Sequence, residues 1–232
     1  MRSTVRNRSC GIKPRIGCTH KRRCSRGCSR KWFVKRLPRP FYERDSLSVA
    51  RDLIGCIFVH RLGNVRVAVR LVEVEAYRGE MDPGSHGYGG MTPRTEVMFG
   101  APGQLYVYFT YGMHYCANVV CDRPGVCEAV LLRAGEPLEG IDEMRVRRPG
   151  ISDRLVAAGP ARLTTAMGIG KDDNGASLLR GGDFWIAEDD ETGEWRAAEV
   201  AETVRVGLSP GKGDDLPWRF VVPGHPYASR RT

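Results

Sequence analysis

The sequence Arg70-Leu-Val-Glu-Val-Glu-Ala-Tyr77 ends a predicted strand, residues 65–77, that is rich in valine. Because successive side chains of a strand point to opposite faces, Glu73, Glu75 and Tyr77 share one face, and the small apolar residues between them share the other. Two carboxylates and a phenol therefore lie on one side of the strand. Such a face is either a solvated surface or part of a catalytic site.

Tyrosines gather further along the chain, around a segment rich in glycine and proline. A predicted strand over residues 104–109 places Tyr106 and Tyr108 on one face, and Tyr111 falls where the chain turns at Gly112. The preceding residues 79–103 hold too many glycines and prolines for long regular elements, and loops of this length are usually functional or disordered. Tyrosines beside such a loop are typical of a base-stacking platform, where each stack contributes about 1–3 kcal/mol. For Tyr106 an ordinary core position fits equally well.

A basic residue ends the apolar strand predicted over residues 127–133. Arg133 would be buried there, and a buried guanidinium requires an anionic partner. We expect that partner to be Glu73 or Glu75. A carboxylate beside an arginine stays ionised at neutral pH, which is the state that a general base needs. The alternative is a structural ion pair without catalysis.

The remaining patterns indicate the fold class. The apolar spacing predicts a helix that begins at Asp45 or Ser46 and ends at Gly55. A turn at residues 62–64 joins strands 56–60 and 65–77. Further strands are predicted at 114–121, 184–187, 204–206 and 219–222, and helices at 141–148 and 160–167. Since strands and helices do not alternate as βαβ units, we predict an α+β fold: one mixed domain around a curved antiparallel sheet.

The charge of the chain is divided unevenly. Residues 1–36 contain 13 of the 36 Lys and Arg and no acidic residue, so residues 37–232 hold 23 basic against 27 acidic residues. We predict a disordered basic tail over residues 1–36 and a folded domain over residues 37–232, with the boundary at the prolines Pro38 and Pro40. The tail would bind phosphates without sequence preference and in a salt-dependent way. The alternative is an upstream stretch that follows a misplaced start codon.

The placement of the cysteines and the hydropathy of the chain indicate the cellular compartment. Four cysteines lie in the predicted domain and read as reduced core residues: Cys56, Cys116, Cys121 and Cys127. The tail cysteines Cys10, Cys18, Cys24 and Cys28, with His20, lack the paired spacing of zinc fingers. No signal peptide and no apolar run of about 20 residues is present. We expect a soluble intracellular protein with no membrane association, cytoplasmic and nucleoid-associated in a bacterium or nuclear in a eukaryote.

Ordered motifs over roughly residues 38–228 resemble the alkyladenine (3-methyladenine) DNA glycosylase family. The motifs are Val74-Glu-Ala-Tyr77, His86, Met91-Thr-Pro-Arg94, Met98-Phe99, Pro102-Gly-Gln-Leu-Tyr-Val-Tyr108, Tyr111-Gly-Met113, Asn118, Leu131-Leu-Arg-Ala134, Glu136-Pro-Leu-Glu-Gly140, Gly159-Pro160 and Arg205-Val-Gly207. The tail lies outside the resemblance. One departure is the loop between His86 and Thr92, which is one residue shorter than in vertebrate members and leaves the substrate range open.

The resemblance implies a role for each matching residue. Glu75 would deprotonate a water below the sugar C1′, with Arg133 and the main-chain carbonyl of Val206 holding that water. The base pocket would be lined by Tyr77, His86 and Tyr108. Asn118 would oppose guanine, and Tyr111 would fill the gap that the extruded base leaves. The resemblance also implies a single mixed domain, no metal or organic cofactor, and double-stranded DNA containing damaged purines as the partner; we expect a monomer.

The predicted function is base-excision DNA repair. The protein would flip alkylated or deaminated purines of the 3-methyladenine, hypoxanthine and ethenoadenine class out of the duplex and hydrolyse the N-glycosidic bond, leaving an abasic site. No lysine or N-terminal proline is placed to attack C1′, so we expect a monofunctional glycosylase without AP-lyase activity. Two rivals remain: a non-catalytic nucleic-acid-binding domain, and a metal-dependent nuclease that uses Glu73, Glu75 and Asp82 as ligands, which the positive charge of Arg133 would oppose.

Overall fold

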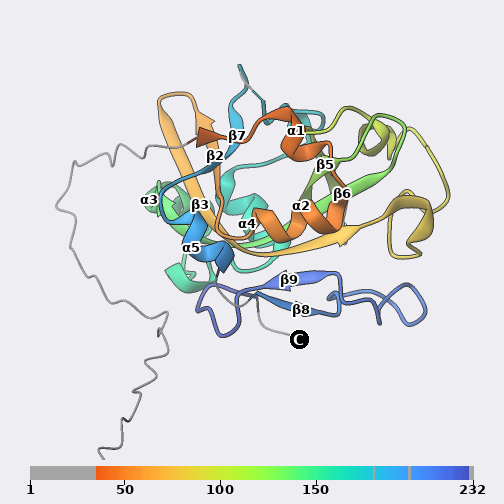
Figure 1. Cartoon of the computed structure of the whole chain (residues 1–232). Coiled ribbons are helices and arrows are strands. Elements are labelled where there is room, and N and C mark those ends of the chain that lie inside the picture. Colours follow the sequence, from red (N-terminus) through yellow and green to blue (C-terminus); the bar gives the residue numbers. More distant parts are fainter. Residues whose placement is uncertain (1–34, 180, 198–199, 230–232) are drawn as a thin grey trace, which may run out of the picture. The chain divides into compact units, whose positions relative to one another are not determined.

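The computed structural model describes residues 35–179, 181–197 and 200–229. Its strands form one sheet with the order β1-β7-β2-β3-β6-β5-β4, to which β9 is added beside β3 and β8 beside β9 (Figure 1). The strands are β1 (Lys35–Arg36), β2 (Ile57–Leu62), β3 (Val65–Tyr77), β4 (Leu105–Thr110), β5 (His114–Cys121), β6 (Glu128–Glu139), β7 (Phe184–Glu188), β8 (Ala201–Thr203) and β9 (Arg219–Val221). All of these pairings are antiparallel. The predicted α+β class with an antiparallel sheet is therefore confirmed.

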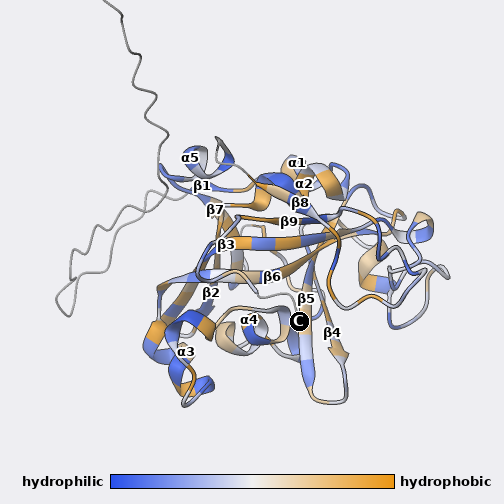
Figure 2. Cartoon of the chain, turned by 90° about the horizontal axis from the view of Figure 1, so that it is seen from below, coloured by the Kyte–Doolittle hydropathy of each residue, from blue (hydrophilic) through white to orange (hydrophobic). Residues whose placement is uncertain are grey.

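Helices are few and short. They are α1 (Arg39–Tyr42), α2 (Ser46–Leu53), α3 (Ile141–Arg147), α4 (Pro160–Met167) and α5 (Thr192–Ala197). Helix α2 begins as predicted, because the Asp45 carboxylate accepts the amide protons of Leu47 and Ser48 and so caps the first turn. Helices α3 and α4 pack against one another (Figure 2).

A β-bulge in β3 determines which residues face the core. The register between β3 and β6 shifts on both sides of Glu73. Before the shift the odd positions Val69 and Leu71 belong to the main apolar core, and after it the even positions Val72 and Val74 do. An extra residue in one strand has this effect, because it reverses the alternation of all side chains that follow. The odd residues Glu73, Glu75 and Tyr77 are thereby placed on the face opposite the core.

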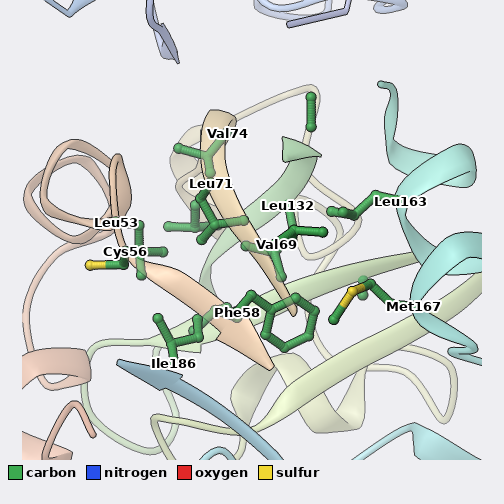
Figure 3. Close-up of a cluster of buried hydrophobic side chains, with 14 of the residues drawn as sticks. Leu53, Cys56, Phe58, Val69, Leu71, Val74, Leu132, Leu163, Met167 and Ile186 are labelled. Atoms are coloured by element: carbon green, nitrogen blue, oxygen red, sulfur yellow. The ribbon is translucent and has the colours of Figure 1, made fainter. Parts of the chain in front are cut away.

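The main core lies on one face of the sheet and joins strands to helices. Leu53 of α2 and Leu163 and Met167 of α4 pack with Leu71 and Leu132 of the two central strands (Figure 3). A smaller apolar cluster lies apart from it and consists of Met98, Phe99, Tyr106, Val120, Cys127 and Ala129. The four cysteines of the described part are buried and unpaired, as predicted. The tail cysteines lie outside the described residues.

Several expectations about individual elements need correction. Residues 204–206 are not a strand; the strand lies three residues earlier, as β8, and pairs with β9. Helix α5 was not predicted. Pro40 occupies the first turn of α1, where a missing N–H costs no hydrogen bond. Lys35 and Arg36, which the charge pattern places in the tail, form β1 beside β7. The rest of the predicted tail, residues 1–34, lies outside the described residues.

The long glycine-rich segment behaves as predicted. Between β3 and β4 the regular structure consists of two single 3₁₀ turns, Gly79–Met81 and Glu96–Phe99.

Within the part of the chain that the structure describes, no helix is long and apolar enough to cross a membrane.

Candidate active site

Four strands bring polar side chains together on the face opposite the main core. Glu75 of β3 pairs with Leu131 of β6, Leu131 pairs with Asn118 of β5, and Asn118 pairs with Tyr106 of β4. These four residues form one row across the sheet. Since side chains two residues apart share a face, the row also fixes the positions of Tyr77, Tyr108 and Arg133.

Glu75 is fully buried and receives three hydrogen bonds. Its Oε2 accepts from Arg133 Nη1 at 3.0 Å and from the Tyr77 hydroxyl at 3.1 Å. Its Oε1 accepts from the main-chain N–H of Val206 at 2.8 Å. The contact with Val206 thus uses its amide group, whereas the resemblance assigned a role to its carbonyl. Tyr77 lies on the same strand as Glu75, but Arg133 and Val206 come from distant parts of the chain, so tertiary structure fixes the orientation of the carboxylate.

Burial raises the pKa of Glu75 above its ordinary value, against the opposing effects of Arg133, the Val206 amide and the Tyr77 hydroxyl. We expected the arginine to dominate. Desolvation outweighs it because a fully buried carboxylate loses its hydration. The consequence is a carboxylate that binds a proton more strongly than an exposed one, which favours its use as a base.

Arg133 contacts both carboxylates of β3, not one of them. Its Nε donates to Glu73 Oε1 at 2.8 Å while its Nη1 donates to Glu75. The arginine is itself 5% exposed, and neighbouring carboxylates raise its pKa although burial opposes this. It therefore remains charged between the two acids.

The aromatic residues pack around His86, which the glycine-rich segment supplies. The rings of Tyr106 and Tyr108 are stacked with centroids 5.3 Å apart, and the His86 ring meets Tyr108 edge-on at 4.5 Å. His86 Nδ1 lies 3.1 Å from the Tyr106 hydroxyl. Burial lowers the pKa of His86, so the ring is neutral at pH 7. Tyr106 is fully buried in the smaller apolar cluster, which decides the open question about this residue in favour of core packing.

A cavity of about 190 Å³ opens among these side chains. Its lining includes seven of the eight residues to which the resemblance assigned a role: Tyr77, His86, Tyr108, Tyr111, Asn118, Arg133 and Val206. The eighth, Glu75, lies immediately behind this wall, because its three donors all belong to it. The buried Oδ1 of Asn118, which has no hydrogen-bond partner, supplies an unused acceptor in the same wall.

Tyr111 projects from the tip of the β4–β5 hairpin. It is 80% exposed and has a φ of 50°, and Gly112 follows with a φ of 67°. A tyrosine rarely adopts the left-handed region, and such residues gather at functional sites. The hairpin thus holds a large apolar side chain in solvent at the mouth of the cavity.

One buried ion pair beside the cavity was not predicted. Arg205 forms two hydrogen bonds to Asp82, at 2.6 and 2.7 Å, and both side chains are fully buried. Arg205 stands within the quoted motif Arg205-Val-Gly207, but a single arginine outside a periodic element gives no sign of its partner. The pair also removes Asp82 as a metal ligand. Among the described residues, no group of three acidic, histidine or cysteine side chains is arranged to hold a metal ion.

Comparison with known proteins agrees with this arrangement. The sequence model of the family described as methylpurine-DNA glycosylase matches residues 40–226. A protein of Burkholderia lata is 46% identical over 200 residues, which cover 86% of this chain and 93% of the relative. Relatives from Methanoculleus marisnigri and Carboxydothermus hydrogenoformans are 49% and 45% identical, each over 84% of this chain and 99% of the relative. All three relatives bear the name "Putative 3-methyladenine DNA glycosylase".

The family match and the names of the relatives place the chain among the DNA glycosylases. The chain belongs to the methylpurine-DNA glycosylase family. It is therefore a DNA-repair glycosylase by family, and the resemblance drawn from its motifs is confirmed.

Proposed function

We propose that this protein removes alkylated or deaminated purines from duplex DNA by hydrolysing the N-glycosidic bond, with Glu75 as the general base. The observation that carries the proposal is the Glu75 carboxylate, held by Arg133, Val206 and Tyr77 directly behind the wall of an aromatic cavity. The names of the relatives support 3-methyladenine as one substrate. Hypoxanthine and ethenoadenine share its purine shape and are proposed as further substrates.

A base within the double helix must leave it before a side chain can reach C1′. This step costs a few kcal/mol and is easiest for damaged or mispaired bases. Tyr111 would fill the vacated position, since exposed apolar side chains serve as wedges between base pairs in other DNA-binding proteins. The extruded base would then stack on Tyr77 and Tyr108, with His86 at its edge. Asn118 would exclude the exocyclic amino group of guanine.

The chemical step needs one carboxylate. As the C1′–N9 bond breaks, its electron pair leaves with the base and positive charge develops on the sugar. Glu75 would stabilise this charge and accept a proton from the water whose oxygen forms the new bond to C1′. Arg133 and Val206 would orient the carboxylate and that water. The residues that line the cavity in the described part include no lysine, which supports hydrolysis without a Schiff base.

The test uses a set of duplexes, each with one lesion at a defined position, incubated with the full chain in EDTA. We expect alkali-labile sites opposite an intact complementary strand for at least 3-methyladenine. Glu75→Gln should retain binding to the lesion duplex and lose excision, because the amide cannot accept the proton. As a matched control, Glu139→Gln alters a partly exposed acid that pairs with Arg66 on the same two strands and should excise normally. Binding without excision by the unaltered chain would instead support the non-catalytic rival.

A further inference from the structure

Glu73 is a second buried carboxylate that the proposed chemistry does not use. It is fully buried, and it does not line the cavity. Its Oε1 accepts from Arg133 Nε at 2.8 Å, from Arg219 Nε at 2.8 Å and from the Ser229 hydroxyl at 2.7 Å. Its Oε2 accepts from the Ser229 main-chain N–H at 2.6 Å. Four donors on one carboxylate far exceed what an isolated ion pair requires.

These donors come from segments far apart in the sequence. Arg219 belongs to β9, which pairs with β3 at the level of Glu73, and its Nη1 also donates to the Thr203 hydroxyl of β8. Ser229 lies at the end of the described chain, in a segment that Arg154 anchors through the Pro226 carbonyl at 2.9 Å. Glu73 therefore connects the C-terminal segment to Arg133.

Arg133 is held along two edges. Its Nε faces Glu73 and its Nη1 faces Glu75, so a rotation of the guanidinium would break both bonds. The cluster holds two acids and two arginines: Glu73 contacts both Arg133 and Arg219, and Glu75 contacts Arg133. Without the charge of Glu73, two guanidinium groups would act on Glu75 alone.

We infer that Glu73 is a positioning residue for base excision: with Ser229 it holds Arg133 against Glu75, and its charge offsets that of the two arginines so that Glu75 remains an effective base. This rests on the proposed role of Glu75. The pKa values of the two carboxylates are shifted in opposite directions. Burial alone would raise the pKa of Glu73, but Arg133, Arg219 and Ser229 together lower it, whereas the pKa of Glu75 is raised. Such a separation is typical of neighbouring acids with different roles.

The test compares Glu73→Gln and Arg219→Gln with the unaltered chain, in two measurements on each. The first is the pH dependence of kcat/KM for a lesion duplex, and the second is the titration of the Glu75 side-chain carbon by ¹³C NMR, assigned with Glu75→Gln. Removing the charge of Glu73 should lower the pKa of Glu75 by about one unit. The acidic limb of the pH profile, where kcat/KM falls as Glu75 is protonated, should move to lower pH by the same amount. The maximal rate should also fall, since a less basic carboxylate is a weaker general base.

Arg219→Gln should have the opposite effect and move the acidic limb of the pH profile to higher pH, because it removes a positive charge that contacts Glu73. Glu139→Gln should move neither quantity. If Glu73 is purely structural, Glu73→Gln will reduce the folded fraction and the rate but will leave the acidic limb of the pH profile and the pKa of Glu75 unchanged. That result would overturn the inference. If the unaltered chain excises no lesion, the proposed function fails, but the NMR titration still decides the coupling between the two acids.

Ser229→Ala provides a variant that does not alter the buried charges. The main-chain N–H of residue 229 remains as a donor, and only the hydroxyl contact with Glu73 is lost. Loosening Glu73 and Arg133 should lower the single-turnover rate by about tenfold, the change expected for roughly one hydrogen bond to a charged group. If Glu73→Gln and Arg219→Gln do not fold, an unchanged rate in folded Ser229→Ala overturns the inference.

Discussion

The guanidinium of Arg205 lies over the ring of Tyr77, with its central carbon 4.6 Å from the ring centroid. The same group is 5.0 Å from the ring centroid of Trp218, so it contacts two aromatic rings and is also paired with Asp82. It also donates to the carbonyls of Ala76 and Gly213, both at 3.1 Å. Arg205 thus joins the end of β3, the loop that leads to His86, and the segment that carries Val206.

Asp82→Asn should be strongly destabilising, because it leaves Arg205 charged and buried without its anionic partner. We expect a loss of about 3–5 kcal/mol in the free energy of unfolding, measured with urea. Asp183→Asn is the matched control: its pair with Arg61 is more than half exposed and should cost less than about 1 kcal/mol. Similar losses in both variants would contradict the predicted contribution of this buried pair to stability.

The pH dependence of catalysis should reflect the raised pKa of Glu75. Only the ionised carboxylate can accept a proton from water, so activity falls as the pH drops through this pKa. Because burial raises it, the acidic limb of kcat/KM should lie above the value of about 4.3 expected for an exposed glutamate. Profiles between pH 4 and 8, with protein stability checked at each pH, provide the measurement. A limb at or below the ordinary value would show that a different group, or a more solvated Glu75, governs the rate.

Tyr111→Ser should impair excision from duplex DNA without unfolding the protein. The side chain is 80% exposed, so its loss should alter the free energy of unfolding by no more than about 0.5 kcal/mol. A wedge is needed only where a base leaves a stack. We therefore expect a decrease of about tenfold or more with a lesion in duplex DNA and a much smaller one with the same lesion in single-stranded DNA. Val146→Ser, a similarly exposed apolar position on α3, is the control; equal decreases on both substrates would refute the wedge.

Deletion of residues 1–34 tests the basic tail while it leaves β1 in the sheet. Phosphate contacts release counterions, so the loss of the tail should weaken duplex binding at low salt and make the dependence of log affinity on log salt shallower. Excision measured at saturating enzyme in a single turnover should be unchanged, since the proposed chemistry uses residues of the folded domain. A full-length chain with the tail arginines changed to glutamine separates charge from length. If both proteins bind the duplex with unaltered affinity and salt dependence, the tail does not contribute to DNA binding.

Much of this arrangement could be predicted from local sequence. The alternation of residues 73–77 correctly placed Glu73, Glu75 and Tyr77 on one face, because side-chain direction alternates along an uninterrupted strand. The bulge before these residues, which reverses the alternation relative to Val69 and Leu71, was not predicted. The glycines and prolines of residues 79–103 correctly predicted an irregular segment, because they interrupt helices and strands locally. The strand predicted at residues 204–206 was wrong and α5 was not predicted, because such short segments have no periodicity and tertiary contacts decide their conformation.

The sequence by itself determined that Glu73, Glu75 and Tyr77 share a strand face, where most of the central strands lie, and which family the motifs resemble. Only the tertiary structure decided that Arg133 is shared by both acids, that Val206 donates its amide to Glu75, and that Arg205 and Ser229 take part. The physical reason is that strand geometry is set by neighbouring residues, whereas the partner of a buried charge can come from any segment. Burial likewise depends on the whole fold, and burial made Glu75 more basic than its arginine neighbour alone would allow.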